Sequence, residues 1–180
     1  LLSQLAKSGK SPLTEVKALG YSKATIDAVV AKGLAEIAIE FSSQWRTNEL
    51  AVASKPKLNP EQAIACSAIN QSDGYTSFLL EGVTGSGKTE VYLQCLEDVL
   101  RKGKQALILV PEIGLTPQTV NRFRRRFPDT PIMLWHSALT DNERLQTWRF
   151  CQKGSCAIVI GTRSAIFMPF LELGMIIVDE

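Results

Sequence analysis

The stretch from Gly82 to Thr89, GVTGSGKT, has the residue types and the spacing needed to hold a nucleoside triphosphate. It fits the pattern G-x-x-x-x-G-K-[ST] at every fixed position. Its glycines allow successive backbone N–H groups to turn toward the phosphates, and Lys88 reaches the β- and γ-phosphates. The Thr89 hydroxyl is placed to hold Mg²⁺. The sequence therefore predicts a P-loop whose ATP-binding residues are Gly82, Val83, Thr84, Gly85, Ser86, Gly87, Lys88 and Thr89.

An acidic pair, Asp179 and Glu180, follows a uniformly apolar segment at the end of the sequence. A P-loop needs an acidic partner for its metal, so we expect Asp179 to hold Mg²⁺ together with Thr89. A glutamate in the next position can orient the attacking water, which makes Lys88 and Glu180 the predicted catalytic residues. This pairing favours an ATPase of the RecA-like kind over a GTPase, because no N-K-x-D guanine-reading motif occurs in the sequence.

These residues need strands and helices in alternation to position them. Apolar runs predict strands at 76–81, 105–110, 131–135, 156–161 and 174–179. Helical periodicity and capping residues predict helices at 88–102, 117–127 and 141–153. Strands of such uniform apolarity are typical of a parallel sheet covered on both faces. The expected fold is therefore a doubly wound α/β domain at 58–180, a RecA-like P-loop sheet.

Residues 1–41 are predicted to form a separate small domain. Three short helical segments followed by the alternating AEIAIEF segment indicate a winged-helix domain, whose third helix, 23–32, could enter a DNA groove. A winged helix used for protein contacts, or only as a spacer, is the alternative. The segment 42–57 has few periodic apolar residues and is expected to be a linker.

Composition is that of an ordinary globular protein, with 45% hydrophobic and 21% charged residues. A net charge of +2 is too small to argue for nucleic acid. No apolar run approaches the length of a membrane span and the start does not resemble a signal peptide, so we expect no membrane contact. The four cysteines lack C-x-x-C spacing, which predicts no zinc site here and suggests core residues in a reducing cytoplasm.

Five motifs occur in an order that carries a specific resemblance: the P-loop, VPEIGLTPQ (110–118), HS (136–137), GTRSAIF (161–167) and IIVDE (176–180). In this order the chain resembles the first motor lobe of a superfamily 2 DNA helicase. Within that superfamily it is similar to the primosomal replication-restart helicases, in which a winged-helix domain also precedes the motor.

The resemblance implies roles that spacing alone does not give. Gln62 would read the adenine edge, although capping of the helix that begins at Pro60 is a sufficient alternative role. PEIGLTPQ and GTRSAIF would track the sugar-phosphate backbone, which makes the implied DNA-binding residues Thr116, Gln118, Gly161, Thr162, Arg163 and Ser164. Thr116 and Gln118 open a helix beyond a predicted strand end, where N–H groups can face an anion.

The resemblance also implies what the longer protein would do. It would be an ATP- and Mg²⁺-dependent 3′–5′ DNA helicase that restarts stalled forks and initiates primosome assembly, with forked or single-stranded DNA and single-strand-binding proteins as partners. The chain is then expected to be a fragment, without the strand that inserts between the P-loop strand and the Asp179 strand, without the second motor lobe, and without the cysteine-rich zinc region. We expect the isolated fragment to hydrolyse ATP negligibly.

Two other functions remain open at this stage: a P-loop ATPase that remodels RNA or protein, and a DNA-binding regulator switched by ATP. The arginine run at 122–126 is interpreted as the solvated face of an amphipathic helix, with DNA contact as the minority alternative. His136 is interpreted as a structural histidine.

Overall fold

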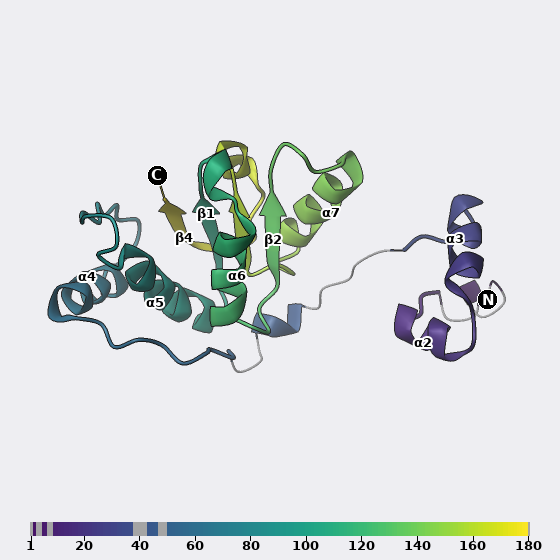
Figure 1. Ribbon diagram of the computed structural model, residues 1–180, viewed down its shortest axis with the longest axis horizontal. Coiled ribbons are helices and arrows are strands. Elements are labelled where there is room, and N and C mark those ends of the chain that lie inside the picture. Colours follow the sequence, from purple (N-terminus) through teal and green to yellow (C-terminus); the bar gives the residue numbers. More distant parts are fainter. Residues whose placement is uncertain (1, 3–4, 7–8, 38–42, 47–49, 180) are drawn as a thin grey trace. The chain divides into compact units, whose positions relative to one another are not determined.

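The computed structural model describes all residues except 1, 3–4, 7–8, 38–42, 47–49 and 180. The chain divides into two compact units, residues 1–40 and 41–180, and each is described by itself (Figure 1).

The first unit contains two described helices, α2 (Leu13–Ala18) and α3 (Lys23–Ala31). Ser22 begins α3 because its side chain accepts a hydrogen bond from the backbone N–H of Thr25 at 3.2 Å. Val16 and Ile26 are the buried side chains of these helices. The predicted first helix and the predicted strand 35–41 fall largely outside the described residues, so the winged-helix fold of this unit stays a prediction.

The second unit is built on a parallel sheet. Its strands are β1 (Gln105–Leu109), β2 (Ile132–Trp135), β3 (Ile158–Gly161) and β4 (Leu173–Val178), in the order β2-β3-β1-β4. Its helices are α4 (Pro60–Asn70), α5 (Lys88–Arg101), α6 (Pro117–Arg126) and α7 (Asp141–Gln152). Short 3₁₀ helices lie at Ser43–Arg46, Glu112–Gly114 and Arg163–Phe167.

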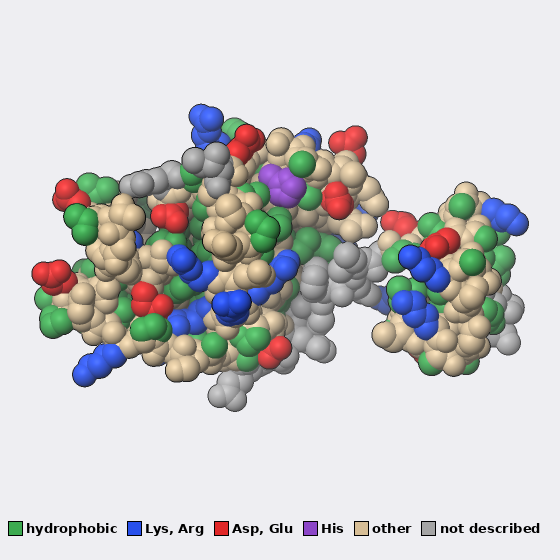
Figure 2. Space-filling view, in the orientation of Figure 1, with side chains coloured by type: hydrophobic (Ala, Val, Ile, Leu, Met, Phe, Trp, Pro, Cys, Tyr) green, Lys and Arg blue, Asp and Glu red, His purple; other side chains and the backbone are tan. Residues whose placement is uncertain are grey.

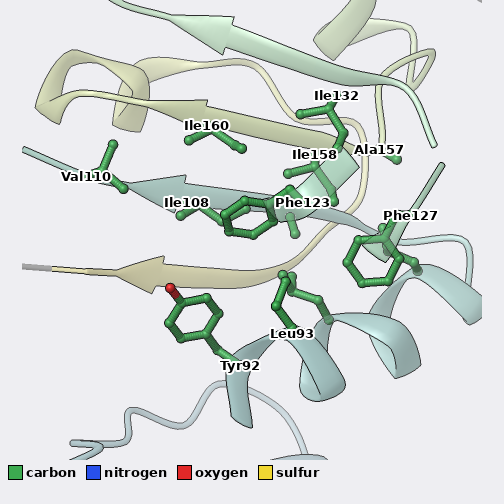
Figure 3. Close-up of a cluster of buried hydrophobic side chains, with 13 residues drawn as sticks. Tyr92, Leu93, Ile108, Val110, Phe123, Phe127, Ile132, Ala157, Ile158 and Ile160 are labelled. Atoms are coloured by element: carbon green, nitrogen blue, oxygen red, sulfur yellow. The ribbon is translucent and has the colours of Figure 1, made fainter. Parts of the chain in front are cut away.

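Helices cover both faces of this sheet. On one face, α5 and α6 pack against the strands through a buried cluster that includes Leu96, Ile108 and Phe123 (Figure 3). On the other face, α7 and the segment after β3 bury Cys151 and Met168 against the strands. Parallel strands with both faces buried are the arrangement that the apolar runs predicted. The expected doubly wound, RecA-like α/β fold is confirmed.

The prediction of a strand at 76–81 is wrong. These residues form no regular element, and Phe78 and Leu79 are 47% and 91% exposed. At the β4 edge of the sheet, Ile176 and Val178 are 46% and 75% exposed, and no other described strand lies beyond β4. A strand is stable only when a neighbour accepts its backbone hydrogen bonds. Apolar composition alone could not show that 76–81 has no such neighbour among the described residues.

The segment predicted as a linker, 42–57, is attached to the second unit. The Trp45 indole Nε1 donates a hydrogen bond to the carbonyl oxygen of Gly154 at 3.0 Å. Further along, the backbone N–H of Ala53 donates to the carbonyl of Arg126 at 3.0 Å, and Leu50 packs against the core. The described part of this segment is therefore bound along the P-loop unit, because its few apolar side chains find buried surface there.

All four cysteines are buried, as expected of core residues, and all are free thiols. Cys66 of α4 and Cys95 of α5 lie with their sulfur atoms 3.5 Å apart, where the two helices pack side by side. Burial raises the pKa of the Cys95 thiol. These thiols are therefore packing groups between α4 and α5.

Candidate nucleotide-binding site

The P-loop leads directly into α5. Gly85 and Gly87 both have φ of 84°, in the left-handed region that favours glycine, so the loop can turn sharply before the helix begins at Lys88. The Lys88 ammonium donates to the carbonyl oxygens of Gly82 at 2.5 Å and Val83 at 3.5 Å. The lysine therefore folds back over its own loop, at the exposed start of α5.

Gln62 connects α4 to this loop. Its amide oxygen accepts from the backbone N–H of Asn59 at 3.0 Å, and its amide nitrogen donates to the carbonyl oxygen of Ser86 at 2.9 Å. A Cβ added to Gly87 would lie 2.5 Å from that nitrogen, so a side chain there would displace Gln62. The capping role offered by the sequence is observed, together with a P-loop contact that the sequence did not suggest.

Tyr92 brings Thr89 and Asp179 to the same place. Its hydroxyl donates a hydrogen bond to Oδ2 of Asp179 at 3.0 Å, and Tyr92 lies one helical turn after Thr89 on α5. Burial is the main cause that raises the pKa of Tyr92 to about 12, and the Asp179 charge adds to it, whereas a hydrogen bond with Thr89 lowers it. The tyrosine thus stays protonated near neutral pH and acts as a donor to the carboxylate.

Asp179 is held by the sheet as well. Its backbone N–H donates to the carbonyl oxygen of Leu109 at 2.9 Å, which continues the β1–β4 pairing to the carboxyl end of both strands. Glu180, the predicted water-orienting residue, lies outside the described residues.

The arginine run at 122–126 is not the wholly solvated face that the sequence suggested. Arg126 is 6% exposed and forms an ion pair with Glu90 in the first turn of α5. Arg122 donates from Nη1 to Oγ1 of Thr89 at 3.2 Å. Only Arg124 and Arg125 are exposed without such contacts to α5. Figure 2 shows Lys and Arg side chains gathered over the region of α5 and α6.

The residues predicted to contact DNA lie at the carboxyl end of the sheet. Leu109 of β1 pairs with Gly161 of β3, so the segments that follow these two strands leave the sheet side by side. After β1, Thr116 begins α6 by accepting from the backbone N–H of Thr119 at 3.2 Å, and Gln118 is exposed.

After β3, the segment with the remaining predicted DNA-binding residues is tied to β2. The backbone N–H of Thr162 donates to the carbonyl of Trp135 at 3.0 Å, and the indole of Trp135 donates to Oγ of Ser164 at 3.0 Å. Arg163 is exposed at the start of a 3₁₀ helix. The structure therefore brings both predicted segments to one edge of the sheet, with Arg163 open to solvent.

Residues 59–180 match the DEAD/DEAH box helicase family, which covers the whole P-loop unit from α4 onward. The chain belongs to this helicase family. In Figure 1 the described part of this match runs from α4 to β4 of the second unit.

The relatives are similar in sequence to this chain over nearly its whole length. It is 49% identical over 167 residues to the Replication restart protein PriA of Haemophilus influenzae, 48% over 166 residues to that of Synechocystis, and 44% over 177 residues to that of Bacillus subtilis. These matches cover 89%, 92% and 95% of the chain but only 23%, 20% and 22% of the relatives. The chain thus spans about a fifth to a quarter of their length.

The oxygen atoms available in the P-loop unit fit a nucleotide with bound Mg²⁺. Mg²⁺ binds oxygen ligands and keeps several of its waters and the substrate phosphates, so it needs only one or two protein groups. Two oxygens are available: the Thr89 hydroxyl, one turn before Tyr92 on α5, and the Asp179 carboxylate, which accepts a hydrogen bond from Tyr92. Within the described residues, no group of three or more His, Cys, Asp or Glu could hold a metal by itself. The described helices likewise include none long and apolar enough to cross a bilayer.

Sequence reasoning missed three residues of this helicase site: Glu90, Tyr92 and Arg122. Only the position of Tyr92, three residues after Thr89 on the predicted helix, indicated that its hydroxyl could reach the metal site. Glu90 pairs with a residue 36 positions away, which spacing cannot reveal.

Proposed function

We propose that this chain is the nucleotide-binding part of an ATP-dependent DNA helicase that acts in replication restart. The observation that carries the proposal is the hydrogen bond between Tyr92 and Asp179, because it holds the acidic end of β4 beside the helix that begins with the P-loop lysine. A nucleotide in the P-loop would then lie between Lys88 and Asp179.

Each group has a role in this proposal. Lys88 exchanges the Gly82 carbonyl for phosphate oxygens and, with the loop amides, stabilises their charge. Thr89 and Asp179 would hold Mg²⁺, which would supply positive charge to neutralise the phosphates. Gln62 reads the adenine edge, and Glu180 orients the attacking water.

DNA is proposed to bind along the carboxyl edge of the sheet. Thr116, Gln118, Gly161, Thr162, Arg163 and Ser164 would contact one strand. Support comes from the parallel pairing of β1 and β3, which places the two segments side by side, and from the exposure of Arg163. Contacts of this kind go mainly to phosphates and carry little sequence information.

The remaining parts of the proposal rest on the likeness to the PriA proteins. The whole protein would move 3′ to 5′, act on forked or single-stranded DNA, and assemble a primosome with single-strand-binding protein in the cytoplasm. Zinc would be bound outside these 180 residues. The isolated chain would turn over ATP negligibly, which agrees with the exposed, unpaired segment at 76–81.

The test is ATP hydrolysis by the full-length protein with forked DNA, single-stranded DNA, RNA or no polymer. The proposal expects hydrolysis that depends on DNA, and unwinding that disappears in Lys88→Ala. Equal rates with DNA, RNA and no polymer would contradict a DNA helicase. Retained output in Lys88→Ala would instead favour a regulator that uses the nucleotide as a switch.

A further inference from the structure

Helix α6 presents one face to the start of α5. Arg126 forms its ion pair with Glu90, and the ring of Phe123 stacks on that of Tyr92 with centroids 6.3 Å apart and planes 13° from parallel. Arg126 and Phe123 are both buried. These two contacts set how α6 lies against α5, and they place Arg122, which precedes Phe123, next to the P-loop.

Arg122 differs from Arg126 in what its charge meets. Its guanidinium donates to the neutral hydroxyl of Thr89 at 3.2 Å in an exposed contact, and the described residues give it no other hydrogen-bond partner. Its charge also reaches Tyr92, whose pKa it lowers slightly against the larger effect of burial. A guanidinium has five N–H donors in a fork that matches phosphate oxygens. The guanidinium therefore has unused donors on the side of the site where Thr89 and Asp179 lie, which we call the metal side.

We propose that Arg122 binds the terminal phosphate of the nucleoside triphosphate. The inference rests on the proposed nucleotide site. Thr89 is the residue that would hold the metal of a bound nucleotide, so a guanidinium in contact with its hydroxyl lies at the phosphate end of that nucleotide rather than beside the base.

Replacing a neutral partner with a charged one favours this exchange. A phosphate adds the attraction of opposite charges and can accept a bidentate pair of hydrogen bonds from the guanidinium, whereas the threonine hydroxyl is neutral and accepts a single bond. Arg122 would leave the Thr89 hydroxyl, which then becomes available to the metal. The ion pair of Arg126 keeps α6 in place while the Arg122 side chain moves.

Arg122 would then distinguish a triphosphate from a diphosphate, because only the triphosphate has the phosphate that it contacts. Its loss should weaken binding of a triphosphate more than binding of a diphosphate. A surface side chain that merely rests on a threonine would affect neither nucleotide. An arginine needed only for folding would affect both equally.

The experiment is calorimetric titration of the full-length protein with Mg²⁺ and either ADP or the β,γ-imido analogue of ATP. Arg122→Ala is expected to weaken binding of the analogue about tenfold and to change ADP binding less than about twofold. Arg122→Lys, which keeps the charge without the fork, should lie between. Arg124→Ala, an exposed arginine of the same helix, is the matched control and should behave as wild type.

The outcomes separate this inference from the proposed function. A wild type that binds neither nucleotide refutes the nucleotide site itself. A wild type that binds both, with Arg122→Ala unchanged or weakened equally for both, refutes only the role of Arg122. A selective loss for the triphosphate, with an unchanged melting temperature, supports it.

Discussion

The two sides of the predicted phosphate site are held together by different kinds of contact. On the metal side, buried side chains of α5 and α6 meet through the Arg126–Glu90 ion pair and the stacked rings of Tyr92 and Phe123. On the loop side, two half-buried side chains make solvent-exposed hydrogen bonds to backbone carbonyls: Lys88 donates to Gly82, and Gln62 donates to Ser86.

This difference separates what is fixed before the nucleotide binds from what the nucleotide can replace. Buried ion pairs and ring stacks persist because removing one partner leaves an uncompensated group in the interior. An exposed bond from an ammonium to a carbonyl contributes little net stability, and phosphate oxygens can take the place of that carbonyl. The buried contacts between α5 and α6 are therefore preorganised, whereas the exposed hydrogen bonds, those of Lys88 and Gln62 on the loop side and that of Arg122 with Thr89, can exchange partners. Substitutions on the loop side should therefore lower activity, whereas substitutions in the buried contacts of the metal side should lower stability.

The largest effect is expected on the loop side, and on activity alone. Lys88→Ala should lower ATP turnover by the full-length protein by a factor on the order of 100 to 1,000, since a preorganised cation at the phosphates is lost. Its free energy of unfolding should change by less than about 0.5 kcal/mol because the hydrogen bonds of the half-buried side chain are exposed to solvent. Lys102→Ala, at the other end of α5, is the control. A large loss of stability in Lys88→Ala would show that the loop-side contacts also stabilise the fold, and would contradict the difference between the two sides.

A metal-side substitution should instead act on stability. Glu90→Gln leaves the charge of Arg126 buried and unpaired, at an expected cost of about 3 kcal/mol in the free energy of unfolding. Chemical denaturation measures it. Combining Glu90→Gln with Arg126→Met should recover part of the loss, because the buried charge is then removed. A cost below about 0.5 kcal/mol would show that this ion pair does not fix α6.

Tyr92→Phe tests the bond that joins the two halves of the site. It removes a hydrogen bond to the Asp179 carboxylate and should lower stability by about 1.5 kcal/mol at pH 7. Since the pKa of Tyr92 is raised from 10.0 to about 12, the stability advantage of wild type is full below pH 10 and is lost as the pH rises through about 12.

Tyr75→Phe provides the comparison for this profile, because Tyr75 is 95% exposed and its loss should leave stability unchanged. Denaturation curves from pH 7 to pH 12 measure both variants. A constant difference between wild type and Tyr92→Phe over this range would contradict the raised pKa.

The smallest effect is expected where Gln62 meets the loop. Gln62→Ala and Asn59→Ala each break the capping box of α4 and should each cost about 1 kcal/mol of stability. Only Gln62→Ala also loses the bond to Ser86, so only this variant should weaken nucleotide binding, by a few-fold. Equal affinities in the two variants would mean that Gln62 serves the helix alone.

The sequence predicted the loop side better than the metal side, for a physical reason. Glycines, Lys88 and Thr89 act through the backbone and through local geometry, which a contiguous motif specifies. The helices predicted to begin at residues 88, 117 and 141 begin at those residues. Arg122 and Arg126, by contrast, were assigned to solvent because periodicity sorts faces by hydrophobicity and cannot show a carboxylate on another helix.

The strand predicted at 76–81 shows the same limit from the other direction. Its apolar residues resemble those of β1. However, β1 lies between two strands, whereas 76–81 pairs with no strand among the described residues. Apolarity shows that a segment can be buried, but pairing decides whether it becomes a strand. The attachment of Trp45 to the second unit was missed for a related reason, since a single aromatic residue carries no periodicity.

The central claim is that a nucleotide and its magnesium bind between the P-loop and Asp179. Nucleotide affinity of the full-length protein, measured with and without Mg²⁺ in wild type and in Asp179→Asn, tests it most directly. Mg²⁺ should strengthen binding in wild type and should have little effect in Asp179→Asn. If Mg²⁺ strengthens binding equally in both proteins, Asp179 does not hold the metal and the account is wrong.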